Sequence, residues 1–196
     1  MALKIYSVSH LVDMLQAEPI AFRETVTLAT NAQMTAGTGI TTGTGTIYKA
    51  SVITKGNIIY TDILMDITGL TSAGTLGDII GKDATANCHL GQITAAINGT
   101  ILGGTMTCLE TPDGGEEDID IYSATVATGT ENAAIGDLTE TAVLNTGADW
   151  TAGTIKAFAD VPDNGYLYFT VGTSSSPTAG DYTAGRFLIQ MWGYAA

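Results

Sequence analysis

Short segments with the composition of β-strands recur along most of this chain, and turn-forming residues separate them at intervals of about 8 to 12 residues. Lys55-Gly56-Asn57 and Asn98-Gly99 have strong turn chemistry, and Gly103-Gly104 predicts a β-bulge. No internal repeat of fixed period is present, which argues against solenoids and propellers. We expect one strand over 22–30 and eight later ones: 47–54, 58–67, 88–94, 100–110, 118–125, 154–158, 166–171 and 186–192.

Composition supports this pattern. Only 14% of the residues are charged, against about 25% in typical globular chains. Abundant threonine favours extended backbone, and 24 glycines supply turns. Together these features predict an all-β fold, a jelly-roll-like β-sandwich of about eight strands formed by residues 31–196. Residues 35–46, rich in glycine and threonine, are interpreted as a loop, and 133–144 as a second helical segment weakened by Gly136.

Residues 1–30 differ from the rest and are predicted to form a short N-terminal helix or arm. Ser7 or Ser9 can cap the helix, and Pro19 ends it. Its apolar side chains have helical spacing: Leu11, Val12, Met14 and Leu15. A helix this short is marginal alone, so the stripe needs an apolar surface, on its own domain or on a neighbour. We therefore take the stripe as the candidate partner-binding site.

The formal net charge is −13, from 20 acidic and 7 basic residues. Such a balance opposes binding to nucleic acid and to anionic membrane surfaces, because both are recognised through Lys and Arg. No apolar run approaches the length of about 20 residues that spans a bilayer, and the first residues lack the order of a signal peptide. We expect neutral or basic protein partners, and neither a nucleic acid nor a membrane.

Residues suited to catalysis are few. Cys88 and Cys108 are interpreted as buried thiols or, alternatively, as a disulfide pair. His89 follows Cys88 on a predicted strand, so the two side chains face opposite ways, and His10 lies in the N-terminal segment. No nucleophile elbow, phosphate-binding loop or zinc-binding helix is present. We expect no enzyme activity, no catalytic residue and no cofactor.

One acidic cluster stands out in the segment TPDGGEEDIDI, and it comprises Asp113, Glu116, Glu117, Asp118 and Asp120. The simplest interpretation is a solvated turn that leads into a strand. The alternatives are contact with a basic patch on a partner, a glycosidase-like carboxylate pair, and a Ca²⁺ site formed by Asp113, Glu116, Asp118 and Asp120. The spacing matches no EF-hand loop.

Three segments carry a resemblance to a known family: 66–81 (DITGLTSAGTLGDIIG), 90–125, and 182–194 (YTAGRFLIQMWGY). In these segments the chain resembles the capsid decoration, or cement, proteins of marine and cyanobacterial tailed bacteriophages. The resemblance implies a jelly-roll or related sandwich that trimerises on the outer capsid surface, with the major capsid protein as partner. It also implies an extended terminus that clamps neighbouring capsomers, and synthesis in the host cytoplasm.

The leading hypothesis is therefore a virion structural protein that stabilises the shell by binding between capsid subunits. A first rival is a tail-associated or fibre-associated adhesin that binds host glycans through exposed aromatics such as Trp150 and Tyr182. A second is a hydrolase that uses Asp118 and Asp120. A third is a small tail or head–tail connector subunit. Aromatic residues that cluster late in the chain are expected to lie partly in the core and partly at a subunit contact.

Overall fold

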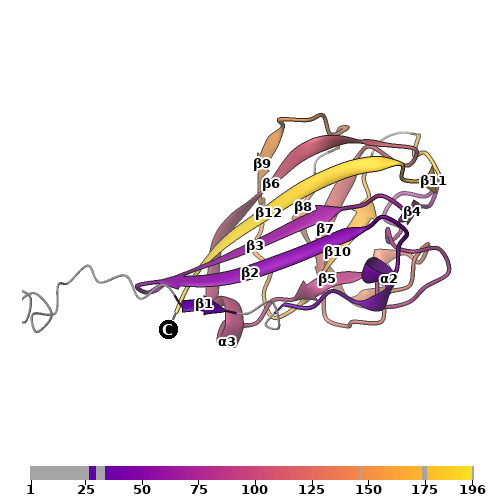
Figure 1. The fold of residues 1–196 in the computed structure, drawn as a ribbon. Coiled ribbons are helices and arrows are strands. Elements are labelled where there is room, and N and C mark those ends of the chain that lie inside the picture. Colours follow the sequence, from indigo (N-terminus) through magenta and orange to yellow (C-terminus); the bar gives the residue numbers. More distant parts are fainter. Residues whose placement is uncertain (1–26, 30–33, 146, 174–175, 196) are drawn as a thin grey trace, which may run out of the picture.

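The structure is a computed structural model that describes residues 27–29, 34–145, 147–173 and 176–195 (Figure 1). Its largest sheet has six antiparallel strands. In spatial order they are β1 (Thr27–Ala29), β2 (Ile47–Lys55), β3 (Ile58–Asp66), β12 (Ala184–Tyr194), β6 (Thr100–Asp113) and β9 (Ile155–Ala157). The mostly β fold predicted from the sequence is confirmed.

A second sheet has four antiparallel strands and packs against the first. In spatial order they are β5 (His89–Gln92), β10 (Tyr166–Val171), β7 (Ile119–Ala124) and β8 (Glu140–Leu144). Two further strands, β11 (Gly180–Asp181) and β4 (Thr71–Ser72), pair with each other. The helical turns are α2 (Thr38–Thr41), α3 (Ala95–Asn98) and the 3-10 helix η2 (Ile135–Leu138). None of the described helices is long and apolar enough to cross a membrane.

The C-terminal strand β12 lies inside the six-stranded sheet, between β3 and β6 (Figure 1). The hairpin of β2 and β3 turns at Lys55-Gly56-Asn57, as predicted, and Gly56 has a φ of +60° that glycine adopts easily. On the other side of β12, Trp192 pairs with Gly103 whereas Gly193 pairs with Ile101. Leu102, which lies between these two pairs and has no partner on β12, forms a bulge one position before the predicted Gly103-Gly104.

Apolar side chains from the two sheets meet in the core. The Phe169 ring of β10 lies 5.7 Å from the Phe187 ring of β12, and Trp150 contacts Phe187 at 5.6 Å, both edge to face. Such aromatic contacts add about 0.5–1.5 kcal/mol beyond the burial of their area. Ile63 and Met106 are fully buried in the same core. The alternating burial along β12 arises because every second side chain of a strand points to the same face.

The second face of the four-stranded sheet is covered by loops. The Tyr168 hydroxyl donates to the carbonyl of Val126 at 2.7 Å and accepts from the amide of Gly129 at 3.2 Å. Ile79 forms a β-bridge with Thr170 of the same sheet. Both faces of this sheet are therefore buried, which explains why nearly all of YLYFTV is inaccessible to solvent.

Several expectations about local structure are wrong. The predicted helix over 133–144 is the short 3-10 helix η2 followed by strand β8. Thr139, with a left-handed φ of +55°, separates the two elements, and β-branched residues then favour pairing with β7. The loop expected over 35–46 contains the one-turn helix α2. The short strands β4, β8 and β11 were not expected.

The Asn98-Gly99 signal also marks a different structure from the one predicted. Asn98 ends the helix α3 instead of entering a hairpin, and Gly99 follows with a φ of +71°. The Asn98 side chain is fully buried, accepts from the amide of Thr94 at 2.9 Å, and donates to the hydroxyl of Thr61 at 2.9 Å. Of the strand predicted over 22–30, the structure shows Thr27–Ala29; the N-terminal helix lies outside the described residues.

Candidate functional site

The acidic segment after β6 is not the solvated turn that the sequence suggested. Glu116, Asp118 and Asp120 are buried, with side-chain exposures of 3% or less, whereas Asp113 and Glu117 are exposed. The segment therefore turns inward at Glu116, directly after the glycine pair 114–115. The positive φ of Gly114, +89°, allows this sharp change of direction.

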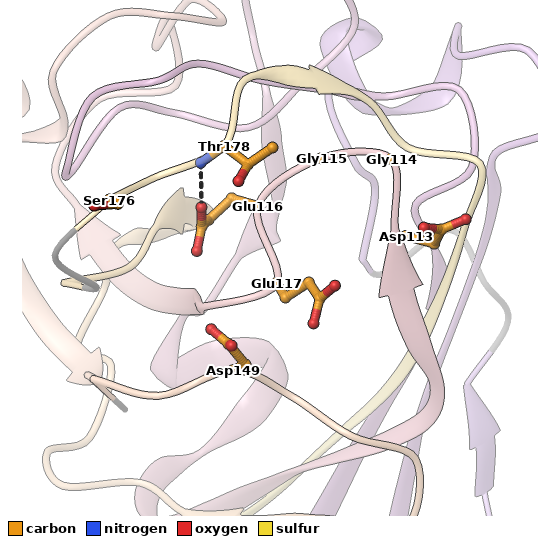
Figure 2. A pocket seen from close by; sticks show the side chains of 8 residues that line it. All are labelled: Asp113, Gly114, Gly115, Glu116, Glu117, Asp149, Ser176 and Thr178. Atoms are coloured by element: carbon orange, nitrogen blue, oxygen red, sulfur yellow. Dashed lines mark hydrogen bonds between the residues drawn. The ribbon is translucent and has the colours of Figure 1, made fainter.

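Glu116 holds two distant parts of the chain together. Its carboxylate accepts hydrogen bonds from the amides of Asp118 and Thr178 (Figure 2). Its own amide donates to the Ser72 hydroxyl at 2.9 Å, and its carbonyl accepts from the Tyr182 hydroxyl at 2.8 Å. Hydrogen bonds to a carboxylate are stronger than neutral ones, so this residue stabilises the loop that precedes β11.

A cavity of about 440 Å³ lies beside this segment, lined by acidic side chains including Asp113, Glu117 and Asp149 (Figure 2). The proposed Ca²⁺ ligands Asp113, Glu116, Asp118 and Asp120 do not form a shared site. Within the described residues there is no group of three or more His, Cys, Asp or Glu side chains that could hold a metal ion. The geometry of this segment instead supports a structural role for Glu116.

Cys88 and His89 lie where the predicted strand begins; Cys88 is buried and His89 is half-buried. Burial raises the pKa of the Cys88 thiol to about 12, and its Sγ donates to the carbonyl of Thr85 at 3.1 Å. Burial lowers the pKa of His89, whose ring packs edge to face on Tyr166 at 4.9 Å. Cys108 is also a buried free thiol. His10 lies outside the described residues.

Trp150 and Tyr182, expected on an adhesin surface, are instead core residues with exposures of 0% and 2%. The indole Nε1 of Trp150 donates to the carbonyl of Ile119 at 2.8 Å, and Lys156 Nζ lies 4.9 Å from its ring. Burial raises the pKa of the Tyr182 hydroxyl. These two residues are wrong as candidate glycan contacts.

The outer face of the six-stranded sheet points away from the core of the described residues. We define the outer face by the outward side chains of five cross-strand rows. They are Ile47, Lys49, Ser51, Ile53 and Lys55 of β2; Ile58, Tyr60, Asp62, Leu64 and Asp66 of β3; Arg186, Leu188, Gln190, Trp192 and Tyr194 of β12; Thr100, Gly103, Thr105, Thr107 and Glu110 of β6; and Ile155 and Ala157 of β9. All of them except Asp66 are exposed or half-buried.

Aromatic residues gather at one end of the outer face. Tyr60, Trp192 and Tyr194 are 41%, 37% and 45% exposed, and Tyr60 pairs directly with Trp192 across the strands. The Trp192 indole lies over Gly103, where an added Cβ would sit 2.9 Å from the ring. Lys55 Nζ lies 5.5 Å from the centre of the Tyr60 ring. Tyr60 is not among the residues predicted from the sequence to form a site, although the alternation in IIYTDILMD places it opposite the buried side chains.

The outer face is electrically balanced in an acidic chain. Its cations are Lys49, Lys55 and Arg186, and its anions are Asp62, Asp66 and Glu110, so three positive and three negative charges give a net charge of zero. The whole chain carries −13. A second acidic protein would therefore meet less repulsion on this face than the net charge of the chain suggests.

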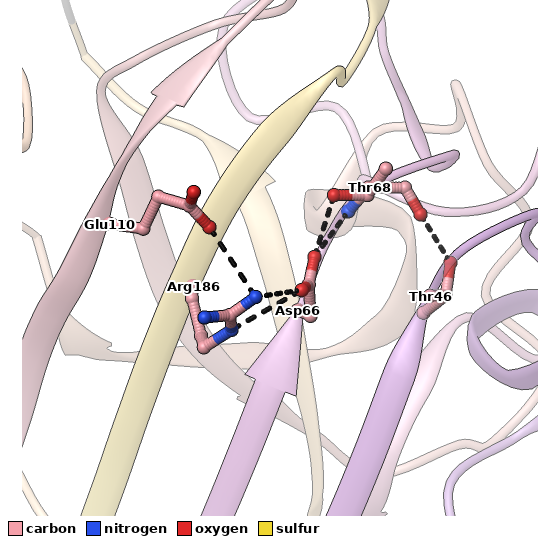
Figure 3. Close-up of polar contacts among 5 residues, drawn as sticks. All are labelled: Thr46, Asp66, Thr68, Glu110 and Arg186. Atoms are coloured by element: carbon pink, nitrogen blue, oxygen red, sulfur yellow. Dashed lines mark hydrogen bonds and ion pairs between the residues drawn. The ribbon is translucent and has the colours of Figure 1, made fainter.

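Arg186 occupies the end of the outer face opposite the aromatic residues. Figure 3 shows it between Asp66 and Glu110. Its guanidinium donates to Asp66 through Nη2 at 2.7 Å and Nε at 3.2 Å, and Nη2 lies 3.6 Å from Glu110. Asp66 also accepts from the amide and hydroxyl of Thr68. Burial works to raise the pKa of Asp66, but the hydrogen bonds from Thr68 and Arg186 outweigh it and the pKa is lowered.

Comparisons with protein-family models, with curated proteins and with solved structures found no match to this chain. The candidate site therefore stands on its own geometry. That geometry offers a surface of zero net charge with exposed aromatic and aliphatic side chains. Exposed aromatic side chains that gather at one end of a surface are typical of sites that bind another molecule.

Proposed function

We propose that this chain is a virion structural protein that decorates the outer capsid shell of a tailed bacteriophage and binds between major capsid protein subunits. The observation that carries the proposal is the neutral outer face, with its exposed aromatic residues, in a chain of charge −13. Aromatic side chains are enriched at the centres of protein–protein interfaces. The negative remainder of the surface suits the outside of a DNA-filled shell.

The mechanism in this proposal is mass action. A protein that binds the assembled shell but not its separated subunits stabilises the assembly, by an amount that grows with its free concentration relative to its Kd. A homotrimer multiplies weak contacts, because the second and third sites bind at high effective concentration. The arm of residues 1–30, with the stripe Leu11, Val12, Met14 and Leu15, is the proposed clamp.

The same proposal assigns the domain to the jelly-roll type of sandwich. Its support is the path of the chain, which passes repeatedly between the two packed antiparallel sheets. β5 lies in the four-stranded sheet, β6 in the six-stranded sheet, β7 in the four-stranded sheet again, and β12 back in the six-stranded sheet. Such crossing connections are typical of Greek-key sandwiches.

Purified protein mixed with expanded, undecorated shells tests the function. We expect saturable co-sedimentation and a higher temperature of shell disruption. Ile155, 65% exposed at the β9 edge of the outer face, provides a variant: Ile155→Lys should weaken binding about tenfold or more by burying a charge. Val126→Lys, on a loop over the other sheet, is the matched control and should bind normally. No binding of the unmodified protein would refute the proposal.

A glycan-binding adhesin is the second candidate, and one observation favours it. Tyr60 and Trp192 lie side by side, and the next row holds Asp62 and Gln190, joined by a hydrogen bond of 3.1 Å. Aromatic rings beside hydrogen-bonding groups also suit stacking on sugars. A glycan array separates the two functions, because only an adhesin should retain glycans and lose them with Trp192→Ala.

A further inference from the structure

The direction of β1 determines where the N-terminal segment leaves the described domain. β1 runs antiparallel to β2, with Ala29 opposite Val52 and Thr27 opposite Thr54. The chain therefore enters β1 from the side of Lys55, at the tip of the β2–β3 hairpin. This is the same end of the sheet that carries the aromatic residues, since Ile58 beside the tip pairs with Tyr194.

The length of chain before β1 is enough to reach such a face. The eight residues 19–26 span at most about 26 Å when extended. Crossing a sheet from β1 to β12 takes three strand spacings, or about 14 Å. The apolar stripe at residues 11–15 can therefore reach the centre of an aromatic end that lies beside β1.

The sequence favours contact of the apolar stripe with a neighbouring copy of the chain. The strand pattern predicted over 22–30 continues five residues before Thr27. Because Thr27 lies opposite Thr54, an extended chain would use one of these residues to reach the level of Lys55, and the other four would extend about 13 Å past it. An extended continuation in that direction leaves the chain's own outer face. A second copy placed beyond the tip would then receive the stripe.

The chemistry of the segment and of the aromatic end also match. Leu11, Val12, Met14 and Leu15 supply apolar side chains to a surface that exposes Tyr60 and Trp192. The same segment carries Asp13 and Glu18 as well as Lys4, and the charged outward side chain of β2 at the aromatic end is Lys55. Contact between Lys55 and an acid of the segment would favour one orientation of the docked segment.

We propose that residues 1–18 of one copy pack on the aromatic end of the outer face of a second copy. The inference rests on the proposed function, because it names one partner of the same face. Each copy gives an arm and receives one, so the contact joins two different surfaces. A contact of that type closes into a ring when the rotation between copies allows it, and three copies form the smallest ring beyond a dimer.

The test uses the full chain and a variant that lacks residues 1–26, both without shells. Light scattering after gel filtration should give about 61 kDa for a full-length trimer of 20.2 kDa chains and a monomer mass for the variant. A peptide of residues 1–26 should bind the shortened variant saturably. Trp192→Ala or Tyr60→Ala in that variant should weaken peptide binding about tenfold or more, because exposed aromatics dominate such contacts.

Two controls make the result specific. Ile155→Ala removes an exposed apolar side chain at the far edge of the same face and should leave peptide binding unchanged. A peptide with Leu11→Asp and Leu15→Asp should not bind. A monomeric full-length chain, or peptide binding that Trp192→Ala does not alter, would overturn the inference. Shell binding that persists in either case would leave the proposed function standing.

Discussion

Arg186 donates two hydrogen bonds to Asp66, at 2.7 and 3.2 Å, and so joins the last strand of the chain to the second strand of the β2–β3 hairpin. The two residues lie 120 positions apart and pair directly across β12 and β3. Asp66 is almost fully buried, whereas the Arg186 side chain is 42% exposed. The pair therefore closes the polar end of the outer face and fixes the register of β12.

Asp66→Asn is expected to lower the free energy of unfolding by about 1–3 kcal/mol at neutral pH, because it removes charge-assisted hydrogen bonds to a buried group. The pKa of Asp66 is lowered in the folded protein, so its stabilisation is present above the unfolded pKa and disappears as the pH falls through the lower folded value. Urea unfolding between pH 7 and about pH 2.5 measures the free energy of unfolding of both proteins. The difference between the two free energies should shrink below about pH 4.

Asp62→Asn is the matched control for that prediction. Asp62 also lies on the outer face of β3, but it is half-buried and accepts one hydrogen bond, from Gln190 at 3.1 Å. Its loss should cost less than about 1 kcal/mol. Equal costs for the two variants, or an unchanged difference in acid, would contradict the role assigned to Asp66.

The positions of the longer strands could be predicted because their signals are local. The alternation of polar and apolar residues in 58–67 and 186–192 reflects one buried and one solvated face, which is how β3 and β12 lie. The helix expected over 133–144 failed for a non-local reason. Pairing of Ala142 with Tyr122 makes β8 a strand, and no pattern within the segment announces that partner.

The candidate site was harder to predict than the fold. Glu116, Asp118 and Asp120 looked like a solvated cluster because acidic residues are rarely buried. Glu116 is buried because Thr178, 62 residues away, supplies an amide to its carboxylate. The neutral outer face also depends on pairing, since it combines residues from strands that are distant in sequence. A single sequence shows the alternation within each strand but not which strands are neighbours.

Gly81→Ala should destabilise the fold by about 1–3 kcal/mol through overpacking. A Cβ at Gly81 would lie 2.8 Å from the Cβ of Cys88 and even closer to its sulfur, in a fully buried region. Gly74→Ala is the control, because its Cβ would meet Ala179 at an ordinary 3.5 Å. Urea midpoints measure both. Adding Cys88→Ala to Gly81→Ala removes the sulfur and should restore part of the lost stability. If it restores none, the steric clash with Cys88 is not the cause of the destabilisation.

Both cysteines are expected to be unreactive toward a thiol reagent in the native protein and to react together on unfolding. Burial raises the pKa of Cys88 to about 12 and also raises that of Cys108, so the reactive thiolate is scarce at neutral pH. Time courses of labelling, with and without urea, measure this. Leu102→Cys, at a site 57% exposed on β6, should react at once. Rapid native labelling of the unmodified chain would contradict the burial.

His89 is expected to make the fold less stable as the medium becomes mildly acidic. Burial lowers its pKa below 6.5 in the folded protein, and its Nδ1 is buried without a hydrogen-bond partner among the described residues. The neutral ring is therefore favoured in the folded state. Its contribution is fully present above the unfolded pKa of about 6.5 and is lost as the pH falls from there through the lower folded value.

His89→Gln removes this titration while keeping a polar side chain that can lie beside Tyr166. We expect the variant to be less stable than the unmodified protein at pH 7.5, because the ring contact at 4.9 Å is lost. Between pH 7.5 and 5 the difference in stability between the two proteins should narrow, since only the unmodified protein has the half-buried imidazole whose pKa is lowered by folding. Other titrating groups, such as Glu131 with its raised pKa, are common to both proteins and cancel in the difference. Parallel stability curves across that range would show that the pKa of His89 is the same in the folded and unfolded states, and would contradict the prediction.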